Sequence, residues 1–414
     1  MRHAPWLQSA GRVPAILAAA AMLATTASAR TEKVLYSFTG GSDGEYPDTD
    51  LIIDRAGDLY GTSVTGGDFD SGTVFELTPS GDGWIETVLY SFTSGADGGQ
   101  PYGGVTRDAE GNLYGTAVVG GAGGACEGGC GVVFKLTNSG GTWSESVIHN
   151  FTGGLDGSGP GAGLTLDPQG NLYGMTPTGG AEGLGVVYQL KPQTDSTWKE
   201  LVIHTFTGGA DGATGSAGRL LPDGAGDLYG VATTGGAYGQ GIAFELLPGP
   251  AGKWQLNTLY AFKGEPDAGF PYSALTFDSS GSLYGTTYSD GANDLGAVYK
   301  LTRGPGGWSE TVLYSFKGGS DGSGPISNLV FDATGNLYGT TSEGGAPGCS
   351  CGAIFRLSPT SNGSWTEGVA YRFRGVPDGG FVYNGMVRGP AGSFYGSTVH
   401  GGADDEGSIF KFTP

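Results

Sequence analysis

Aspartate is the chemically active residue that recurs most regularly in this sequence. Seven aspartates each follow a phenylalanine by five residues, in the pattern Phe-x-Gly/Ser-x-x-Asp: Asp43, Asp97, Asp156, Asp211, Asp267, Asp321 and Asp378. Seven carboxylates on one rim of a fold could attract Ca²⁺, an amine or a cationic surface. A repeated Asx-turn would give the same pattern, because an aspartate side chain also accepts hydrogen bonds from its own loop. The sequence leaves both interpretations open.

A second set of aspartates begins tight turns of the form Asp-x-x-Gly. Each lies five residues before a leucine, and the set consists of Asp54, Asp108, Asp167, Asp223, Asp278 and Asp332, with Gly389 at the seventh position. An aspartate at the start of a hairpin turn accepts hydrogen bonds from the backbone, and the glycine tolerates a positive φ. We therefore interpret this set as structural.

Histidine is the usual base of hydrolytic sites, and three lie beyond residue 29. His149 and His204 occupy a slot that holds tyrosine in the other repeats, which favours packing. His400 precedes Gly401-Gly402 and is followed by Asp404, Asp405 and Glu406. That loop could bind a cation or supply a base, although a solvated charged loop has the same composition. No metalloprotease, phosphate-loop, dinucleotide or nucleophile-elbow motif occurs in a suitable context, so no catalytic residue is predicted.

The four cysteines form two close pairs in glycine-rich loops, Cys126-x-x-x-Cys130 and Cys349-x-Cys351. An oxidising compartment would favour two local disulfides, of which the shorter ring would be strained. Free thiols are one alternative. A metal site is another, but it would need ligands from both pairs to converge, with no histidine beside them.

Seven repeats must position these residues. The tripeptide Leu/Phe-Tyr-Gly recurs at intervals of 54 to 59 residues, with its tyrosine at Tyr60, Tyr114, Tyr173, Tyr229, Tyr284, Tyr338 and Tyr395. Each repeat contains four short strand patterns separated by turn signals, and glycine, with 84 residues, makes long helices improbable. Four strands in each repeat predict an all-β fold, a seven-bladed β-propeller with four-stranded blades.

The two ends of the repeat region predict how the ring closes. Val34-Leu35-Tyr36-Ser37-Phe38 is a fourth-strand phrase without the tryptophan that precedes the other six, and the sequence ends on a third strand, residues 408–412. The N-terminal strand should therefore complete the last blade and leave no large sheet edge exposed. Residues 30–414 should form a single domain.

The phrases Val34–Gly41, Asp332–Thr341 and Gly344-Gly345-Ala346 resemble the tandem GloVer repeat of bacterial exported proteins. All seven copies match, from about Val34 onward. Members often carry one of several C-terminal anchors, and this sequence shows no such anchor motif at its end. The resemblance implies export and a repeat fold, and it brings no established activity and no site residues.

Residues 1–29 resemble a secretory signal peptide, with two arginines, an apolar run over residues 13–23 and Ala27-Ser28-Ala29. The run is too short for a membrane span. Cleavage would leave 18 basic and 40 acidic residues and a net charge of −22, which disfavours nucleic acid as a partner. We expect a secreted or periplasmic monomer without a membrane span.

These features favour a non-catalytic propeller whose loop face binds a glycan, a cell-envelope component or another protein. Ca²⁺ is the one cofactor that the aspartate rim would suit. An extracellular carbohydrate-active enzyme, a glycoside hydrolase or lyase, is the alternative, because such enzymes need only two carboxyl groups on that face. A display scaffold without a ligand is a third hypothesis.

Overall fold

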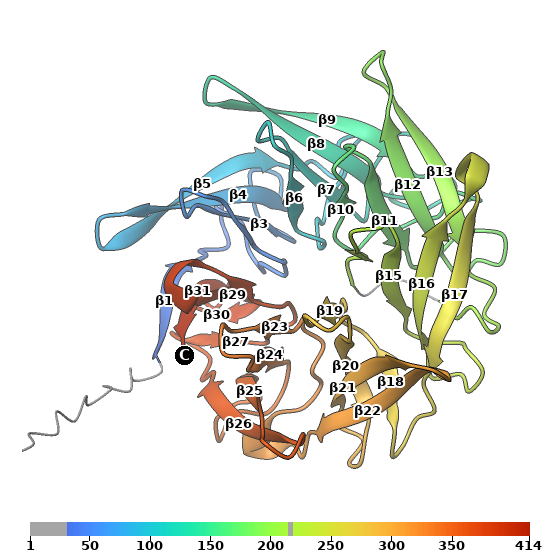
Figure 1. The fold of residues 1–414 in the computed structure, drawn as a ribbon. Helices are drawn as coiled ribbons and strands as arrows, with labels where there is room; N and C mark the ends of the chain where they lie inside the picture. The colour runs from blue at the N-terminus through green and yellow to red at the C-terminus, as the bar shows by residue number, and fades with distance from the viewer. Residues whose placement is uncertain (1–30, 214–217) are drawn as a thin grey trace, which may run out of the picture.

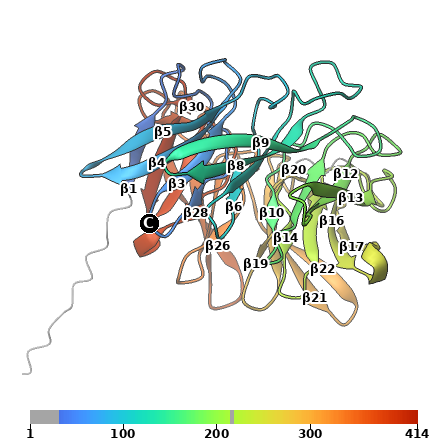
Figure 2. The same ribbon diagram turned by 90° about the horizontal axis from the view of Figure 1, so that it is seen from above.

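Seven small antiparallel sheets surround a common centre in the computed structural model, which describes residues 31–213 and 218–414 (Figure 1). Seen after a 90° turn, the strands run between two loop-bearing faces (Figure 2). The seven-bladed β-propeller predicted from the repeats is confirmed. The predicted signal peptide, residues 1–29, lies outside the described residues. In the described ranges no helix is long and apolar enough to cross a membrane.

The first four blades follow the chain, each with its strands in order from the centre outward. Blade 1 contains β2 (Ile52–Ile53), β3 (Leu59–Ser63), β4 (Thr73–Ser80) and β5 (Gly83–Ser91). Blade 2 contains β6 (Val105–Arg107), β7 (Leu113–Ala117), β8 (Val132–Ser139) and β9 (Thr142–Asn150). Blade 3 contains β10 (Thr165–Leu166), β11 (Leu172–Thr176), β12 (Val186–Pro192) and β13 (Trp198–Thr205). Blade 4 contains β14 (Leu221–Pro222), β15 (Leu228–Ala232), β16 (Ile242–Pro248) and β17 (Trp254–Ala261).

The last three blades complete the ring, and blades 5 and 7 carry small additions. Blade 5 contains β18 (Ala268–Pro271), β19 (Thr276–Phe277), β20 (Leu283–Asp290), β21 (Ala297–Gly304) and β22 (Gly307–Ser315). Blade 6 contains β23 (Val330–Phe331), β24 (Leu337–Thr341), β25 (Ala353–Pro359) and β26 (Trp365–Arg372). Blade 7 contains β28 (Val387–Arg388), β29 (Phe394–Thr398), β31 (Ser408–Thr413) and β1 (Thr31–Ser37), and β27 (Gly379–Gly380) pairs with β30 (His400–Gly401) beside it. Three single turns of 3₁₀ helix are η1 (Pro250–Gly252), η2 (Gly319–Asp321) and η3 (Pro390–Gly392).

The hydrophobic core lies between neighbouring blades. One of its seven clusters joins Tyr60 and Val74 of blade 1 to Leu113 and Phe134 of blade 2. The second strand of each blade and the first part of the third strand are buried on both sides, because the adjacent blades cover them. This explains why β4 departs from simple alternation: Val74, which the sequence pattern places on the face opposite Phe75, is also fully buried.

The ring closes through the N-terminal strand, as predicted. β1 pairs antiparallel with β31 from Thr31 opposite Thr413 to Ser37 opposite Ser408. Phe38, which follows β1, is fully buried and lies 5.2 Å from Phe75 of blade 1, measured between ring centres. The first residues of the domain therefore hold blade 7 to blade 1.

One face of the ring carries the loops that hold the rim aspartates. The loop entering each blade pairs with the loop between the second and third strands of that blade; for example, Gly67 donates its backbone N–H to the carbonyl of Gly41 at 2.9 Å. The expected shared face of the aspartate loops and the Gly-Gly loops is thus present, and we call it the loop face.

Candidate functional site

The rim aspartates serve as hydrogen-bond acceptors for their own loops. Asp43 accepts bonds from the backbone N–H of Thr39 at 2.9 Å, from the Thr39 hydroxyl at 2.6 Å and from the Tyr36 hydroxyl at 2.9 Å. The same backbone bond, from the residue four positions earlier, is made to Asp97, Asp156, Asp211, Asp321 and Asp378. These bonds are those of the turn interpretation, and they occupy oxygens that a cation would need.

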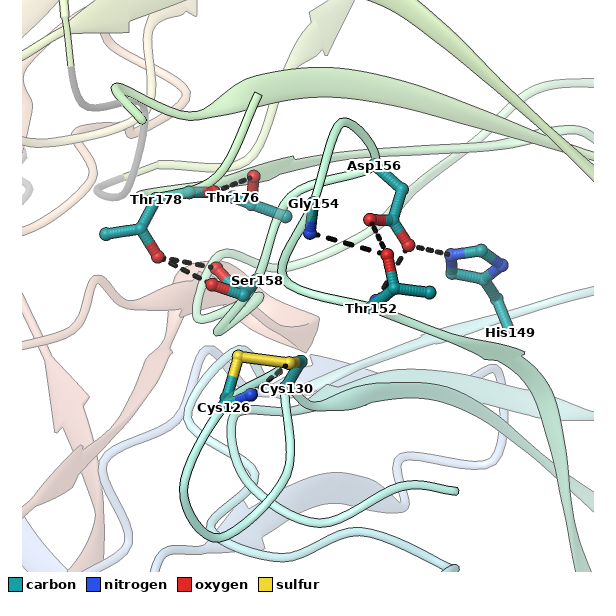
Figure 3. Close-up of a disulfide and its surroundings, with 9 residues drawn as sticks. All are labelled: Cys126, Cys130, His149, Thr152, Gly154, Asp156, Ser158, Thr176 and Thr178. Atoms are coloured by element: carbon teal, nitrogen blue, oxygen red, sulfur yellow. Dashed lines mark hydrogen bonds and ion pairs between the residues drawn. A yellow bond between two sulfur atoms is a disulfide. The ribbon is translucent and has the colours of Figure 1, made fainter. Parts of the chain in front are cut away.

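Where histidine replaces tyrosine, both rings keep the edge-on packing of this slot, but only His204 keeps the hydrogen bond to the rim aspartate, because the Nε2 of His149 has no hydrogen-bond partner in the described structure. Figure 3 shows Asp156 between Thr152 and His149, whose Nε2 lies 3.9 Å from the carboxylate. His204 approaches Asp211 more closely, at 3.1 Å. The His149 ring also packs edge-on against Phe151, at 4.6 Å between ring centres. The expected packing role therefore agrees with the structure, and burial lowers the pKa of both histidines.

Behind the rim, the outer strand of each blade except blade 4 carries a partly buried glutamate, which faces the rim aspartate at its blade boundary. We call these the seam glutamates: Glu32, Glu86, Glu145, Glu200, Glu310 and Glu367. Each has a buried Oε1 without a hydrogen-bond partner in the described structure. Burial and the negative charge of Asp43 raise the pKa of Glu86 to about 7. Blade 4 has Leu256 at this position, opposite Leu246, where Glu86 is opposite Leu77.

The acidic loop around His400 does not gather into a cation site. The His400 ring lies between Tyr46 and Phe381, at 5.2 and 5.3 Å between ring centres. Asp405 accepts a hydrogen bond from the backbone N–H of Gly401 at 2.9 Å, and Asp404 is exposed. Among the residues described here, no group of three or more histidine, cysteine, aspartate or glutamate side chains could hold a metal ion. Neither the rim nor this loop therefore provides such a group of ligands for Ca²⁺.

Both cysteine pairs are joined within their own loops. Cys126 pairs with Cys130 and Cys349 with Cys351, at Cα separations of 5.1 and 5.2 Å. Figure 3 shows the first pair beside the loop of Asp156. A Cβ added to Gly153 would lie 2.7 Å from the Cys126 sulfur, so this loop can pack on the disulfide only through a glycine. Of the three alternatives, the structure has the local disulfides.

A cavity of the loop face lies at the axis, where sequence analysis predicted no site. The segments that enter the innermost strands surround an opening of about 470 Å³, which we call the axial mouth. Its polar and aromatic lining consists of Asp48, Asp50, Tyr102, Tyr272, Asn328, Tyr383 and Asn384. Glycines allow these segments to close around the axis: a Cβ on Gly104 would lie 2.5 Å from the carbonyl oxygen of Asp50.

Two carboxyl groups of the axial mouth accept hydrogen bonds from amides that enter from blades 6 and 7, far away in the sequence. Asn384 donates a hydrogen bond to Asp48, and Asn328 donates to both oxygens of Asp50 at 3.2 and 3.0 Å. The Asn328 side-chain oxygen in turn accepts a bond from the backbone N–H of Ala274 at 2.9 Å, which fixes the amide orientation. Burial raises the pKa of Asp48 to about 7, the bond from Asn384 opposes this increase, and the charge of Asp50 adds to it.

Three tyrosines line the same opening and remain accessible. Tyr102, Tyr272 and Tyr383 have exposed fractions of 39%, 38% and 37%. Burial raises the pKa of each phenol, and the negative charge of Asp48 contributes to all three increases. Tyr288, which is half exposed, also influences the pKa values of Tyr272 and Tyr383. Aromatic rings, phenol hydroxyls and a carboxyl group thus converge on one space.

A second cavity of about 370 Å³ continues along the axis and shares Asp50 and Asn328 with the axial mouth. We call it the lower channel. Its lining is mostly apolar, with Leu164 and Met386 among the contributors, and Arg219 is its one basic residue within the described ranges. The Nε and Nη2 atoms of Arg219 are buried and have no hydrogen-bond partner there.

A signal for the axial mouth exists in the sequence as a break in the repeat. Asp48 lies five residues after the rim aspartate, and the corresponding residues of the five other copies described at this position are Tyr102, Gly161, Tyr272, Ile326 and Tyr383. This position varies among the copies, and Asp48 is the one acidic residue among those described, an isolated departure of the kind that a functional site in a repeat fold produces.

Comparison with known proteins adds the family and the fold. The model of the Gloeobacter/Verrucomicrobia repeat matches residues 21–225 and 216–414. None of the curated proteins matches the sequence. A solved protein from Bacteroides uniformis, named provisionally as a 6-phosphogluconolactonase, is 14% identical with a TM-score of 0.54, over 82% of this chain and 88% of that one. At this identity the likeness shows the propeller fold alone.

Proposed function

The chain belongs to the Gloeobacter/Verrucomicrobia repeat family, and we propose that it is an exported, non-catalytic propeller that binds a glycan in the axial mouth. The observation that supports this most is the convergence of Tyr102, Tyr272 and Tyr383 with Asp48 on one open cavity. Its volume of about 470 Å³ lies within the range of small-ligand sites. The rim aspartates, which already accept bonds from their own loops, offer a less complete site.

The lining chemistry suits a sugar. Tyrosine rings can cover the apolar C–H surface of a sugar while the phenol hydroxyls remain free to form hydrogen bonds. The amide and carboxyl groups of the lining can donate hydrogen bonds to the sugar hydroxyls or accept hydrogen bonds from them. No hydrogen bond ties the hydroxyls of Tyr102, Tyr272 or Tyr383 within the described structure. A glycan of the cell envelope is the ligand class most accessible to an exported protein, and the two local disulfides support export.

The experiment uses purified residues 30–414 on a glycan array, followed by titration calorimetry with the saccharide that binds best. The Tyr102→Ala and Tyr272→Ala variants should each weaken binding at least tenfold, because each removes a ring that would cover the sugar. Tyr238→Ala is the matched control, since Tyr238 is 58% exposed on a loop outside the axial mouth. Equal loss in the control, or no saccharide bound at all, would refute the proposal.

One observation supports a second candidate, an extracellular glycoside hydrolase. The pKa of Asp48 is raised to about 7 beside Asp50, and a protonated acid next to a second carboxyl group is the pair that such enzymes use. In this case Asp48 would protonate the leaving oxygen, and Asp50 would act as base or nucleophile. Release of reducing ends from a polysaccharide panel, abolished by Asp48→Asn and declining above pH 7, would favour the enzyme. A wild-type protein that binds without releasing reducing ends would exclude it for that saccharide.

A further inference from the structure

We propose that the axial mouth selects glycans that carry a protonated amine, an inference that rests on the glycan-binding function proposed above. The first argument is the charge of the lining. Asp48 and Asp50 are its acidic groups, and lysine, arginine and histidine do not occur among the residues described around the axial mouth. Each carboxyl group is bonded only to a neutral amide, Asn384 or Asn328, and so lacks a counter-charge. An ammonium group is the ligand that would supply it.

The second argument is the arrangement of the aromatic rings. Tyr102, Tyr272 and Tyr383 come from blades 2, 5 and 7 and border the same opening as the two carboxyl groups. Tyrosine rings attract cations through the negative potential of their faces, and several rings around one site form an aromatic cage for ammonium groups. A neutral sugar would use the rings only as apolar surface, whereas an amino sugar would also use their electrostatics.

The third argument is the field of the whole molecule. The chain carries 20 basic and 40 acidic residues, so cationic ligands are drawn toward it and anionic ligands are repelled. The rim aspartates surround the loop face at each blade boundary and add to this field. The whole-molecule charge and the charge of the axial lining therefore favour the same sign of ligand.

The lower channel favours a different class of ligand, one that carries a carboxylate. Arg219 has two buried guanidinium nitrogens without partners, and a carboxylate reaching past Asp50 would satisfy them. A ligand of this kind would be an acidic sugar. It would have to pass Asp48 and Asp50, whose charges oppose it, and for this reason the amine is the better fit.

The test compares three trisaccharides: one of glucosamine, one of N-acetylglucosamine, which differs from the first only by N-acetylation, and a glucuronate-containing trisaccharide that carries a carboxylate. Calorimetric titration at pH 7 and low salt should show that the glucosamine trisaccharide binds at least tenfold more tightly than its acetylated form, because acetylation removes the positive charge. The preference should shrink as salt is added. Asp48→Asn and Asp50→Asn should remove this preference, so that the free and acetylated forms bind each variant with equal affinity.

The outcomes separate this inference from the proposed function. Equal affinity for the free and acetylated amines, with loss on Tyr102→Ala, would overturn the amine preference and leave glycan binding intact. Tighter binding of the glucuronate sugar, lost on Arg219→Gln, would also overturn it and assign an acidic ligand to the lower channel. Binding of none of the three sugars would count against both statements.

Discussion

Replacing seam glutamates by leucine should make this protein more resistant to alkali. The chain itself provides the precedent, because blade 4 has Leu256 where the other outer strands have glutamate. Glu86, Glu145 and Glu200 are three consecutive members with the same environment: each is partly buried and each faces a rim aspartate. The perturbation is the triple variant Glu86→Leu, Glu145→Leu, Glu200→Leu.

The sign of the effect follows from the pKa. Burial raises the pKa of each of these three carboxyl groups to about 7 in the folded state, whereas an unfolded glutamate titrates near about 4.3. The folded protein therefore holds more protons than the unfolded chain between these values. Stability from this source is fully present below the unfolded pKa and is lost as the pH rises through about 7.

The magnitude is limited by solvent. One pKa unit corresponds to about 1.36 kcal/mol, so the full shift would be worth about 4 kcal/mol for each group. The three side chains are only partly buried, and screening by water reduces this to about 1 kcal/mol each. The sites lie on different blades and should be additive, which gives about 3 kcal/mol for the triple variant.

The assay is calorimetric melting at pH 5 and pH 8.5. In a chain of this length, 1 kcal/mol moves the melting temperature by only about 1 °C, so the wild type should lose about 3 °C more than the triple variant between the two pH values. Glu182→Leu is the control, because Glu182 is exposed in a loop. Parallel pH dependence in wild type and triple variant would refute the reasoning, since the glutamates would then be ionised in the folded protein.

Four further tests concern the ring and its loops. Deletion of residues 30–39 removes β1 and the buried Phe38, and it should lower the free energy of unfolding by several kcal/mol; unchanged melting would contradict closure by that strand. Mass spectrometry of non-reduced peptides from exported protein should find Cys126 joined to Cys130, whereas two free thiols would argue against an oxidising compartment. The Asp97→Ala change should cost about 1 to 3 kcal/mol, because the Thr93 N–H and the Tyr90 hydroxyl lose their acceptor. Melting in Ca²⁺ and in EDTA tests the calcium hypothesis: a higher melting temperature in Ca²⁺ would support it, and superimposed curves would leave the rim aspartates as turn acceptors.

The fold was predictable because each repeat carries the same local signals. Leu-Tyr-Gly marks the buried second strand, the Asp-x-x-Gly turn precedes it, and a tryptophan marks the outer strand, so seven copies suffice to predict seven blades. The closing strand was predictable for the same reason, since Val34–Phe38 has the fourth-strand phrase. Its pairing with β31 needs no information beyond the repeat.

The candidate site was not predictable to the same degree. The sequence identified the rim aspartates but could not distinguish a ligand site from a turn, because the distinction depends on hydrogen bonds such as that from Thr39 to Asp43. The axial mouth is harder to predict, because ring closure brings together residues that are far apart in the sequence. Asp48 and Asn384, for example, are separated by 336 positions. The acidic residue at Asp48, which departs from the other copies, could have indicated the axial mouth. The search for a histidine base instead indicated the His400 loop.

A crystal structure of the protein with the best-binding saccharide tests the central claim most directly. The account predicts one sugar residue in the axial mouth, covered by Tyr102 and Tyr272, with a polar substituent within hydrogen-bond distance of Asp48. A saccharide bound to the rim loops or to the outer strands, with the axial mouth free of ligand, would contradict it.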